Sequence, residues 1–325
     1  MRHPLALAFV AAIASIAGAA DAAETYPTRT ITMSVPYAPG GPLDTLARIL
    51  TERMRVVLGQ TIIIENVGGA GGSIGVGRVV RSPPDGYTIG AGNWGSHVAN
   101  VAIYALPYDV LKDLDPVSLL PIEPNVIVAR KGFPPNDLKD LIAWLKQNPD
   151  AATAGTSGVG GPSHMSAIFF AQQTGTRLRL VPYRGAGPAL QDLVAGQTDL
   201  MLTGPSIVLP HLQSGAIKAY AVTAKTRVTA TPDIPTTDEA GLPGFYFSAW
   251  TALWVPKGTP REIIAKLAGA VRDVLADPGL KPRLAALGIE IPPADMLGPE
   301  PLRAFHKAEI EKWVPIIRAA GTKGE

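Results

Sequence analysis

Apolar residues in this chain alternate between short runs typical of buried strands and longer segments with helical spacing. The first strand-like run, at residues 30–35, leads through a Pro- and Gly-rich turn into a helix that begins near Pro42. In that helix the apolar positions are 43, 46, 47, 50, 54 and 57. This spacing of three and four residues places them on one buried face. The chain therefore opens with a strand, a turn and a helix.

The same arrangement recurs along the chain. Further strand-like runs lie at residues 61–64, 87–91, 152–155, 178–182, 200–202 and 219–222, most of them followed by a Gly-rich loop and a helical segment. Strands that alternate with helices in this way predict mostly parallel sheets, which bind ligands beyond the carboxyl ends of their strands. The predicted fold class is α/β.

Two long apolar stretches, at residues 119–129 and 247–255, connect a first set of units with a second, and two amphipathic helices finish the chain. The simplest organisation is two domains, with the C-terminal helices returning to the first. We place domain I at residues 24–124 and 249–325 and domain II at residues 125–248. The two crossing segments would then form a hinge.

The N-terminus has the composition of a secretory signal peptide. Arg2 and His3 precede an apolar run over residues 5–17 and a stretch of small residues over 18–23. The run is short for a membrane span, so we assign residues 1–23 to a leader cleaved after Ala22 or Ala23. The chain has no cysteine, which excludes a lipoprotein anchor, disulfides and thiol chemistry. The mature protein is expected to be exported to the periplasm.

The turn after the first strand is a candidate anion site. Gly40 and Gly41 allow a tight turn and close approach of a ligand, and Pro42 suits the first helical position. The free amides at a helix start, together with the positive end of the helix dipole, favour a carboxylate. Residues 156–163 repeat this chemistry in the second half of the chain. Asp44 does not suit a direct anion contact, so it either caps amides of the first turn or accepts a hydrogen bond from a ligand donor or a water.

The candidate ligand-binding residues lie in these turns and in the loops that follow other strands. Arg184 either pairs with a second acid group of the ligand or is solvated, and Tyr37 and Trp94 either line an apolar ligand or pack internally. No His spacing suggests a metal site, and no metal or cofactor is expected. The full set is Tyr37, Ala38, Pro39, Gly40, Gly41, Asp44, Asn93, Trp94, Ser96, Thr156, Ser157, Gly158, Gly161, Ser163, His164, Arg184 and Gly204.

Other functions can be weighed from motifs. Gly71-Gly72-Ser73-Ile74-Gly75 matches the Gly-x-Ser-x-Gly pattern of serine hydrolases, but a Gly-rich loop separates Ser73 from the preceding strand, whereas a nucleophile elbow follows its strand directly. A secreted serine hydrolase is therefore kept as the alternative function. Glu65 lies where a dinucleotide-binding fold places a ribose-binding acid, yet the turn Pro39–Asp44 lacks Gly-x-Gly-x-x-Gly, and the chain has no Walker sequence. The formal net charge is +2 and no basic run has interleaved aromatics, so nucleic acid is not an expected partner.

Several motifs together resemble the Bug family of periplasmic solute receptors of tripartite tricarboxylate transporters. They include Val35-Pro36-Tyr37-Ala38-Pro39-Gly40-Gly41, Pro84-Asp85-Gly86-Tyr87-Thr88, Leu106-Pro107-Tyr108-Asp109, Val181-Pro182-Tyr183-Arg184-Gly185 and Pro232-Asp233-Ile234-Pro235-Thr236. The resemblance runs from about Tyr26 to the C-terminus. It implies a two-domain periplasmic-binding-protein fold of the type II, Venus-flytrap kind.

The resemblance also implies a function. Such a receptor is not an enzyme; it holds a ligand carboxylate through backbone amides and waters at residues 37–44 and 155–164, and delivers the ligand to membrane permease subunits. Family ligands are di- and tricarboxylates, amino acids and aromatic acids, and a monomer is expected. Pro42-Leu43 replaces the commoner Gly-Thr before Asp44, and Trp94 and Gly204-Pro205 also differ from small-acid receptors. These departures favour an apolar or aromatic acid.

Overall fold

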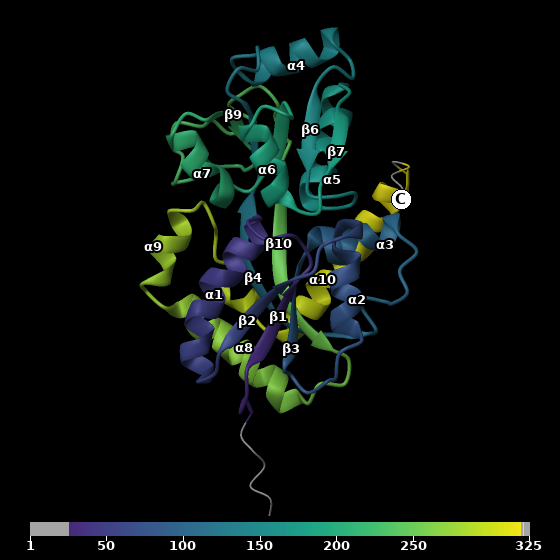
Figure 1. The fold of residues 1–325 in the computed structure, drawn as a ribbon, viewed down its shortest axis with the longest axis vertical. Coiled ribbons are helices and arrows are strands. Elements are labelled where there is room, and N and C mark those ends of the chain that lie inside the picture. Colours follow the sequence, from purple (N-terminus) through teal and green to yellow (C-terminus); the bar gives the residue numbers. More distant parts are fainter. Residues whose placement is uncertain (1–25, 320, 322–325) are drawn as a thin grey trace, which may run out of the picture.

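The computed structural model describes residues 26–319 and 321, which form two five-stranded sheets with helices packed on them (Figure 1). The predicted leader, residues 1–23, lies outside the described residues. The first sheet has the order β2-β1-β3-β10-β4, and its strands are β1 (Ile31–Val35), β2 (Ile62–Asn66), β3 (Thr88–Asn93), β4 (Leu114–Pro124) and β10 (Ser248–Pro256). The second sheet has the order β7-β6-β8-β5-β9, and its strands are β5 (Val126–Arg130), β6 (Thr153–Thr156), β7 (Arg179–Pro182), β8 (Leu200–Thr203) and β9 (Ile217–Val222).

Both sheets are mixed rather than mostly parallel, which corrects the sequence prediction. In the first, β1 pairs parallel with β2 and β3, whereas β10 pairs antiparallel with β3 and β4. In the second, β6 pairs parallel with β7 and β8, whereas β5 pairs antiparallel with β8 and β9. The antiparallel pairs involve the strands at which the chain passes between the sheets, so the crossovers that keep neighbouring strands parallel do not apply there.

We call the first sheet with its helices the first unit and the second sheet with its helices the second unit. The first unit has helices α1 (Pro42–Leu58), α2 (Ser73–Val80), α3 (Asn100–Ile103), α8 (Arg261–Ala276), α9 (Leu280–Ala285) and α10 (Pro299–Ala319), with short turns η1 (Ala70–Gly72), η2 (Gly95–Ala99) and η3 (Ala294–Met296). The second unit has α4 (Leu138–Gln147), α5 (Pro162–Thr174), α6 (Ala186–Val194) and α7 (Pro205–Gln213).

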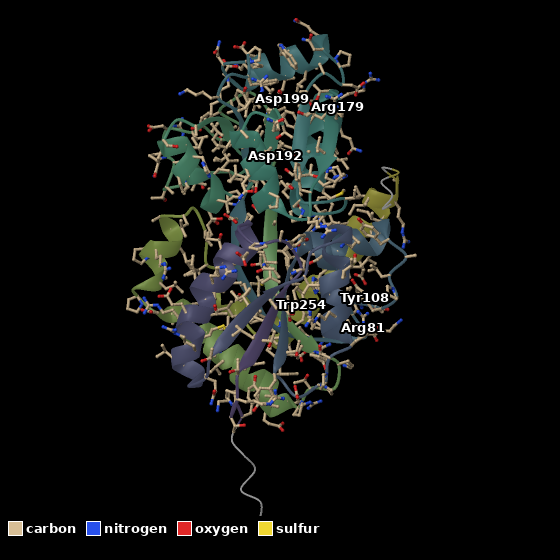
Figure 2. All side chains as sticks on the ribbon, in the orientation of Figure 1. Arg81, Tyr108, Arg179, Asp192, Asp199 and Trp254 are labelled. Atoms are coloured by element: carbon tan, nitrogen blue, oxygen red, sulfur yellow. The ribbon has the colours of Figure 1, made fainter. Side chains whose placement is uncertain are left out.

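Burial of the apolar helix faces fixes the first unit. On one side of its sheet, α1 contributes Leu50 and Met54 to a core that also contains Leu267 and Val271 of α8. On the other side, Trp254 of β10 lies in the interior (Figure 2) and stacks on the His97 ring, with centroids 3.7 Å apart. The long C-terminal helix α10 closes this side. Both C-terminal helices thus pack on the first sheet through their apolar faces.

Two segments connect the units near the axis of the molecule, where β4 and β10 lie beside each other (Figure 1). Only Asn125 separates β4 from β5. The Thr223 N–H donates to the carbonyl oxygen of Asn125 at 2.8 Å, and the Thr223 hydroxyl donates to that of Phe247 at 2.6 Å. Thr223 therefore ties the strand that enters the second unit to the segment that leaves it.

Candidate functional site

A cavity lies between the two units, at the ends of strands from both sheets. It has a volume of about 50 Å³, measured as the space open to the centre of a water molecule. This is room for a few waters or one small ligand, since one water needs about 10–15 Å³ of such space. Its walls are formed by Tyr37, Gly41, Pro42, Leu43, Asp44, Asn93, Glu123, Asn125, Ser157, Pro162, Ser163, Ala186, Thr203, Gly204, Ala249 and Thr251.

The β1–α1 turn supplies one wall. Gly40 has a positive φ of 80°, which glycine adopts without strain, and Pro42 begins the helix at a position where no N–H is needed. The amides of Leu43 and Asp44 lie in the first helical turn and so have no carbonyl partner within the helix. These are the donors that the sequence predicted for a carboxylate.

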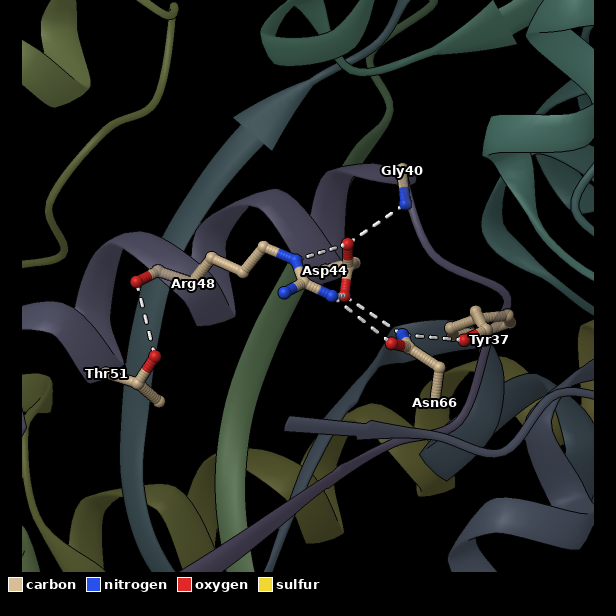
Figure 3. A network of polar contacts seen from close by, with 6 residues as sticks. All are labelled: Tyr37, Gly40, Asp44, Arg48, Thr51 and Asn66. Carbon is tan, nitrogen blue, oxygen red and sulfur yellow. Dashed lines mark hydrogen bonds and ion pairs between the residues drawn. The ribbon is translucent and has the colours of Figure 1, made fainter. Parts of the chain in front are cut away.

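Asp44 belongs to a network that holds this turn in place (Figure 3). Its carboxylate accepts hydrogen bonds from the Gly40 N–H at 2.9 Å, from Arg48 Nε and Nη2 at 2.9 and 3.0 Å, and from Asn66 Nδ2 at 2.9 Å. Burial alone would raise the pKa of Asp44, but the hydrogen bonds from Arg48, Gly40 and Asn66 outweigh it and hold this pKa below its ordinary value. The side chain therefore bonds the amide before the helix rather than an amide of its first turn.

The β6–α5 loop supplies the facing wall. The Ser157 N–H donates to Ser163 Oγ at 2.6 Å, and the Ser163 hydroxyl donates to Ser157 Oγ at 2.8 Å. Ser157 Oγ accepts that bond and keeps its own proton for an acceptor in the cavity. Two glycines shape this loop. Gly158 has a φ of 102°, and the Gly161 N–H donates a hydrogen bond to the carbonyl oxygen of Gly158 at 2.9 Å.

Glu123 and Asn125 also line the cavity, although the sequence motifs did not predict them as site residues. Glu123 Oε2 accepts the Ser206 N–H at 3.2 Å, and Oε1 accepts the Ser206 hydroxyl at 3.1 Å. Burial raises the pKa of Glu123 to about 7, although both bonds from Ser206 oppose the rise. The buried amide nitrogen of Asn125 has no hydrogen-bond partner. The available signal was that Glu123 and Asn125 are the two polar residues within an otherwise apolar stretch at 119–129.

Seven of the predicted ligand-binding residues line the cavity: Tyr37, Gly41, Asp44, Asn93, Ser157, Ser163 and Gly204. The Tyr37 hydroxyl donates to Asn93 Oδ1 at 3.0 Å, and burial raises the pKa of this tyrosine. Gly204 leaves room for Glu123, because a Cβ atom at this glycine would lie 2.2 Å from Glu123 Cδ. Gly204 also precedes the first residue of α7.

Other predicted residues lie near the cavity but outside its walls. Trp94 is packed in the core against Phe169, Phe247 and Trp313, and the Ser96 hydroxyl is bonded to Asn93. His164 and Thr156 are buried beside each other, and burial lowers the pKa of His164 to about 4.

The remaining predicted residues join the two units. The Ala38 N–H donates to the carbonyl oxygen of Arg184 at 3.0 Å, while the Arg184 residue as a whole is exposed. Pro39 and Gly40 lie against Gly187 at the start of α6. A further contact joins the units where the Tyr104 hydroxyl donates to the carbonyl oxygen of Val159 at 2.9 Å. The two units are therefore in contact at more than one point.

The hydrolase motif does not form a nucleophile elbow. β2 ends at Asn66, and η1 precedes Ser73, which begins α2. The Ser73 hydroxyl oxygen accepts Asn100 Nδ2 at 3.0 Å, inside the first unit. An elbow instead exposes its serine on a sharp turn directly after a strand.

Metal-binding clusters and helices able to span a membrane are both absent from the described residues. In residues 26–319 no group of three or more His, Cys, Asp or Glu side chains is placed to hold a metal ion. Within the same part of the chain, no helix combines the length and apolar character of a membrane span.

The chain is similar to proteins of a known family and to several solved structures. Residues 46–322 match the family described as the tripartite tricarboxylate transporter family receptor. MatC from Rhodopseudomonas palustris, solved with bound malate, is 41% identical with a TM-score of 0.85, over 90% of this chain and 100% of that one. The periplasmic binding protein BugD is 39% identical with a TM-score of 0.87, over 92% and 99%.

A third solved structure is the R. palustris protein Rpa4515 with adipate. It is 33% identical with a TM-score of 0.86, over 91% of this chain and 98% of that one. These likenesses confirm the predicted two-domain periplasmic-binding-protein fold.

Proposed function

The chain belongs to the tripartite tricarboxylate transporter receptor family, and we propose that it is an extracytoplasmic receptor that binds a small organic carboxylate and delivers it to the membrane permease of such a transporter. Solute receptors of this family are not enzymes. The relatives solved with malate and adipate support a carboxylate as the ligand of this chain. Export through the leader at residues 1–23 and action as a monomer in the periplasm belong to the same proposal.

The observation that carries the proposal is the pair of facing walls around the cavity. One wall offers the first-turn amides of α1 and the other offers the Ser157 hydroxyl and the start of α5. Preorganised donors at two helix starts favour an anion. None of the described residues that line the cavity is Lys, Arg or His. Recognition would therefore depend on neutral hydrogen-bond donors, which suits a single carboxylate better than a polyphosphate.

Ligand capture would follow from closure of the two units. We assign residues 24–124 and 249–325 to one domain and residues 125–248 to the other, with Asn125, Thr223 and Phe247 at the hinge. A ligand that touches both walls binds the closed state more tightly than the open state and shifts the population toward it. The permease would recognise the closed state.

A thermal-shift screen of the mature chain against carboxylic acids tests the proposal. The panel should contain malate, adipate, benzoate and glutamate, with the corresponding amides or alcohols as uncharged controls. An acid that binds only the folded state raises the melting temperature, by an amount that grows with its concentration over Kd. Stabilisation by an acid and not by its uncharged control supports the receptor. If no acid stabilises the protein, the proposal fails.

A further inference from the structure

Glu123 lies on the cavity wall, where its charge state would affect the binding of an anionic ligand. It is 8% exposed, and its neighbour two residues on, Asn125, is 3% exposed and lines the same cavity. Asn125 Nδ2 is a buried donor without a partner. A buried donor of this kind costs free energy unless a ligand accepts from it. The cavity wall therefore includes one residue with a buried, unpartnered N–H and another with a buried carboxyl group.

The carboxyl group of Glu123 has hydrogen bonds but no positive partner. Ser206 donates one bond to each of its oxygens, from its N–H and from its hydroxyl. Glu123 takes part in none of the ion pairs that the described residues form. An ionised carboxylate buried without a cation is unfavourable, and such a group is held partly neutral.

The other titratable groups around Glu123 do not offset its charge. Asp44 faces the cavity from α1 as an anion bound by Arg48, and Tyr37 faces it from the β1–α1 turn. The paired strand β10 contributes the uncharged residues Ala249 and Thr251. On α7, His211 lies in the last turn, away from Ser206. Glu290, whose backbone pairs with Ile122, is exposed.

We propose that Glu123 binds the ligand as a neutral carboxylic acid, whose O–H donates a hydrogen bond to a ligand carboxylate oxygen while Asn125 Nδ2 donates to the same carboxylate. This inference rests on the proposed function and extends it to how the ligand is selected. Protonation of Glu123 is the only covalent change. When Glu123 is ionised in the empty receptor, one proton passes from the buffer to its carboxylate as the ligand binds. An ionised Glu123 would repel an acid anion, whereas a neutral Glu123 donates a hydrogen bond to it. The receptor therefore selects acids through the neutral form of Glu123.

Because Glu123 takes up a proton when the ligand binds, the affinity of the receptor for its acid depends on pH. In the empty receptor burial already raises the pKa of Glu123 to about 7, and a ligand anion beside it raises this pKa further. Affinity is therefore constant well below pH ~7, where Glu123 is already neutral, and falls above it by up to about tenfold per pH unit. An amine that paired with Glu123 would give the opposite trend, because it requires the ionised form.

Isothermal titration calorimetry of the mature chain with malate, adipate, benzoate and glutamate tests this. Titrations in buffers with different heats of ionisation, between about pH 6 and about pH 9, count the protons taken up on binding. We expect close to one proton at about pH 8 and close to none at about pH 6. E123Q should bind with an affinity that does not change over this range and without proton uptake. The control E290Q should keep the wild-type profile.

Two results would overturn the inference: binding of an acid without proton uptake at either pH, or binding that releases a proton and strengthens as the pH rises. If E123Q did not fold, the proton count of the wild type would decide alone. Failure of all four compounds to bind at any pH would overturn the proposed ligand class together with this inference. Binding with the wrong proton count overturns the role of Glu123 only, so the two failures are distinguishable.

Discussion

The backbone N–H of Ala38 donates a hydrogen bond to the carbonyl oxygen of Arg184 at 3.0 Å, and this bond joins the first unit to the second beside the cavity. The sequence motifs predict both residues as ligand contacts. The structure instead uses their backbones to bring the β1–α1 turn against the loop before α6. We assign this contact to the closed state that the proposed function requires.

Gly187→Ala should hinder this closure. Gly187 lies in the first turn of α6, and a Cβ atom there would lie 2.3 Å from the carbonyl oxygen of Pro39 in the facing unit. The helix itself tolerates alanine, which has a better helix propensity than glycine. We expect a folded protein whose affinity for its acid falls at least about tenfold, because the closed state is lost. Small-angle scattering with saturating acid would show a larger radius of gyration than the wild type.

The matched control is Gly269→Ala in α8, where a Cβ atom meets nothing within 4 Å. It should bind and close like the wild type. Compaction of the Gly187 variant to wild-type dimensions would contradict the closure contact.

Gly41→Val should block the proposed site without unfolding the chain. Gly41 has φ of −86°, which valine adopts, and its Cβ position lies 3.6 Å from Ala186 Cβ in ordinary contact. The branched methyl groups would extend into the cavity or against α6. We expect an unchanged circular dichroism spectrum and loss of acid-induced thermal stabilisation. Wild-type affinity in this variant would refute the assignment of the β1–α1 turn.

Ser157→Ala should weaken binding more mildly. It removes the hydroxyl proton offered to the ligand, and a lost hydrogen bond to a charged group costs about 1.5–3 kcal/mol, or roughly tenfold to a hundredfold in Kd. Titration calorimetry measures this directly, with the exposed Ser214→Ala variant as control. Equal Kd values for the two variants would exclude a ligand contact at Ser157.

Asp44→Asn should destabilise the fold in a way that depends on pH. The bonds from Gly40, Arg48 and Asn66 lower the pKa of Asp44, so its stabilisation is complete above its ordinary pKa of about 4 and is lost as the pH falls through the folded-state value. We expect a loss of about 1–3 kcal/mol at neutral pH that shrinks below pH ~4. Urea unfolding at several pH values measures it, and the exposed Asp295→Asn variant should show no such dependence. A pH-independent loss would exclude the ionic network as its source.

Glu123→Gln should raise the stability of the fold at neutral and higher pH, whereas Asp44→Asn should lower it. The folded-state pKa of Glu123 is raised to about 7, so ionisation costs the wild-type fold stability as the pH rises from its ordinary pKa toward 7. Between the ordinary pKa of a glutamate and pH ~7, the free energy of unfolding of the wild type falls by about 3 kcal/mol. The glutamine variant escapes it, so its melting temperature should exceed that of the wild type at about pH 8 and approach it at about pH 5. An equal difference at both pH values would show that Glu123 is not buried as an unpaired acid.

The local pattern of the sequence determined the elements and the two turns. Apolar spacing predicted α1 from Pro42, glycines and a proline marked the starts of α1 and α5, and alternating strands and helices predicted an α/β fold. These features depend on interactions within a few residues, so they can be inferred without knowing what lies opposite.

Only the tertiary structure decided which side chains meet in the cavity. Glu123 and Ser206 are 83 positions apart, and no local pattern indicates that a strand residue of one unit meets the first turn of a helix in the other. Trp94 was a candidate ligand contact because it follows a strand, but packing with Phe169, Phe247 and Trp313 buries it in the core. The mixed sheets have the same origin, because β5 and β10 join them at the crossings between units. Contacts between distant segments are set by how whole elements pack, and the sequence alone does not specify that packing.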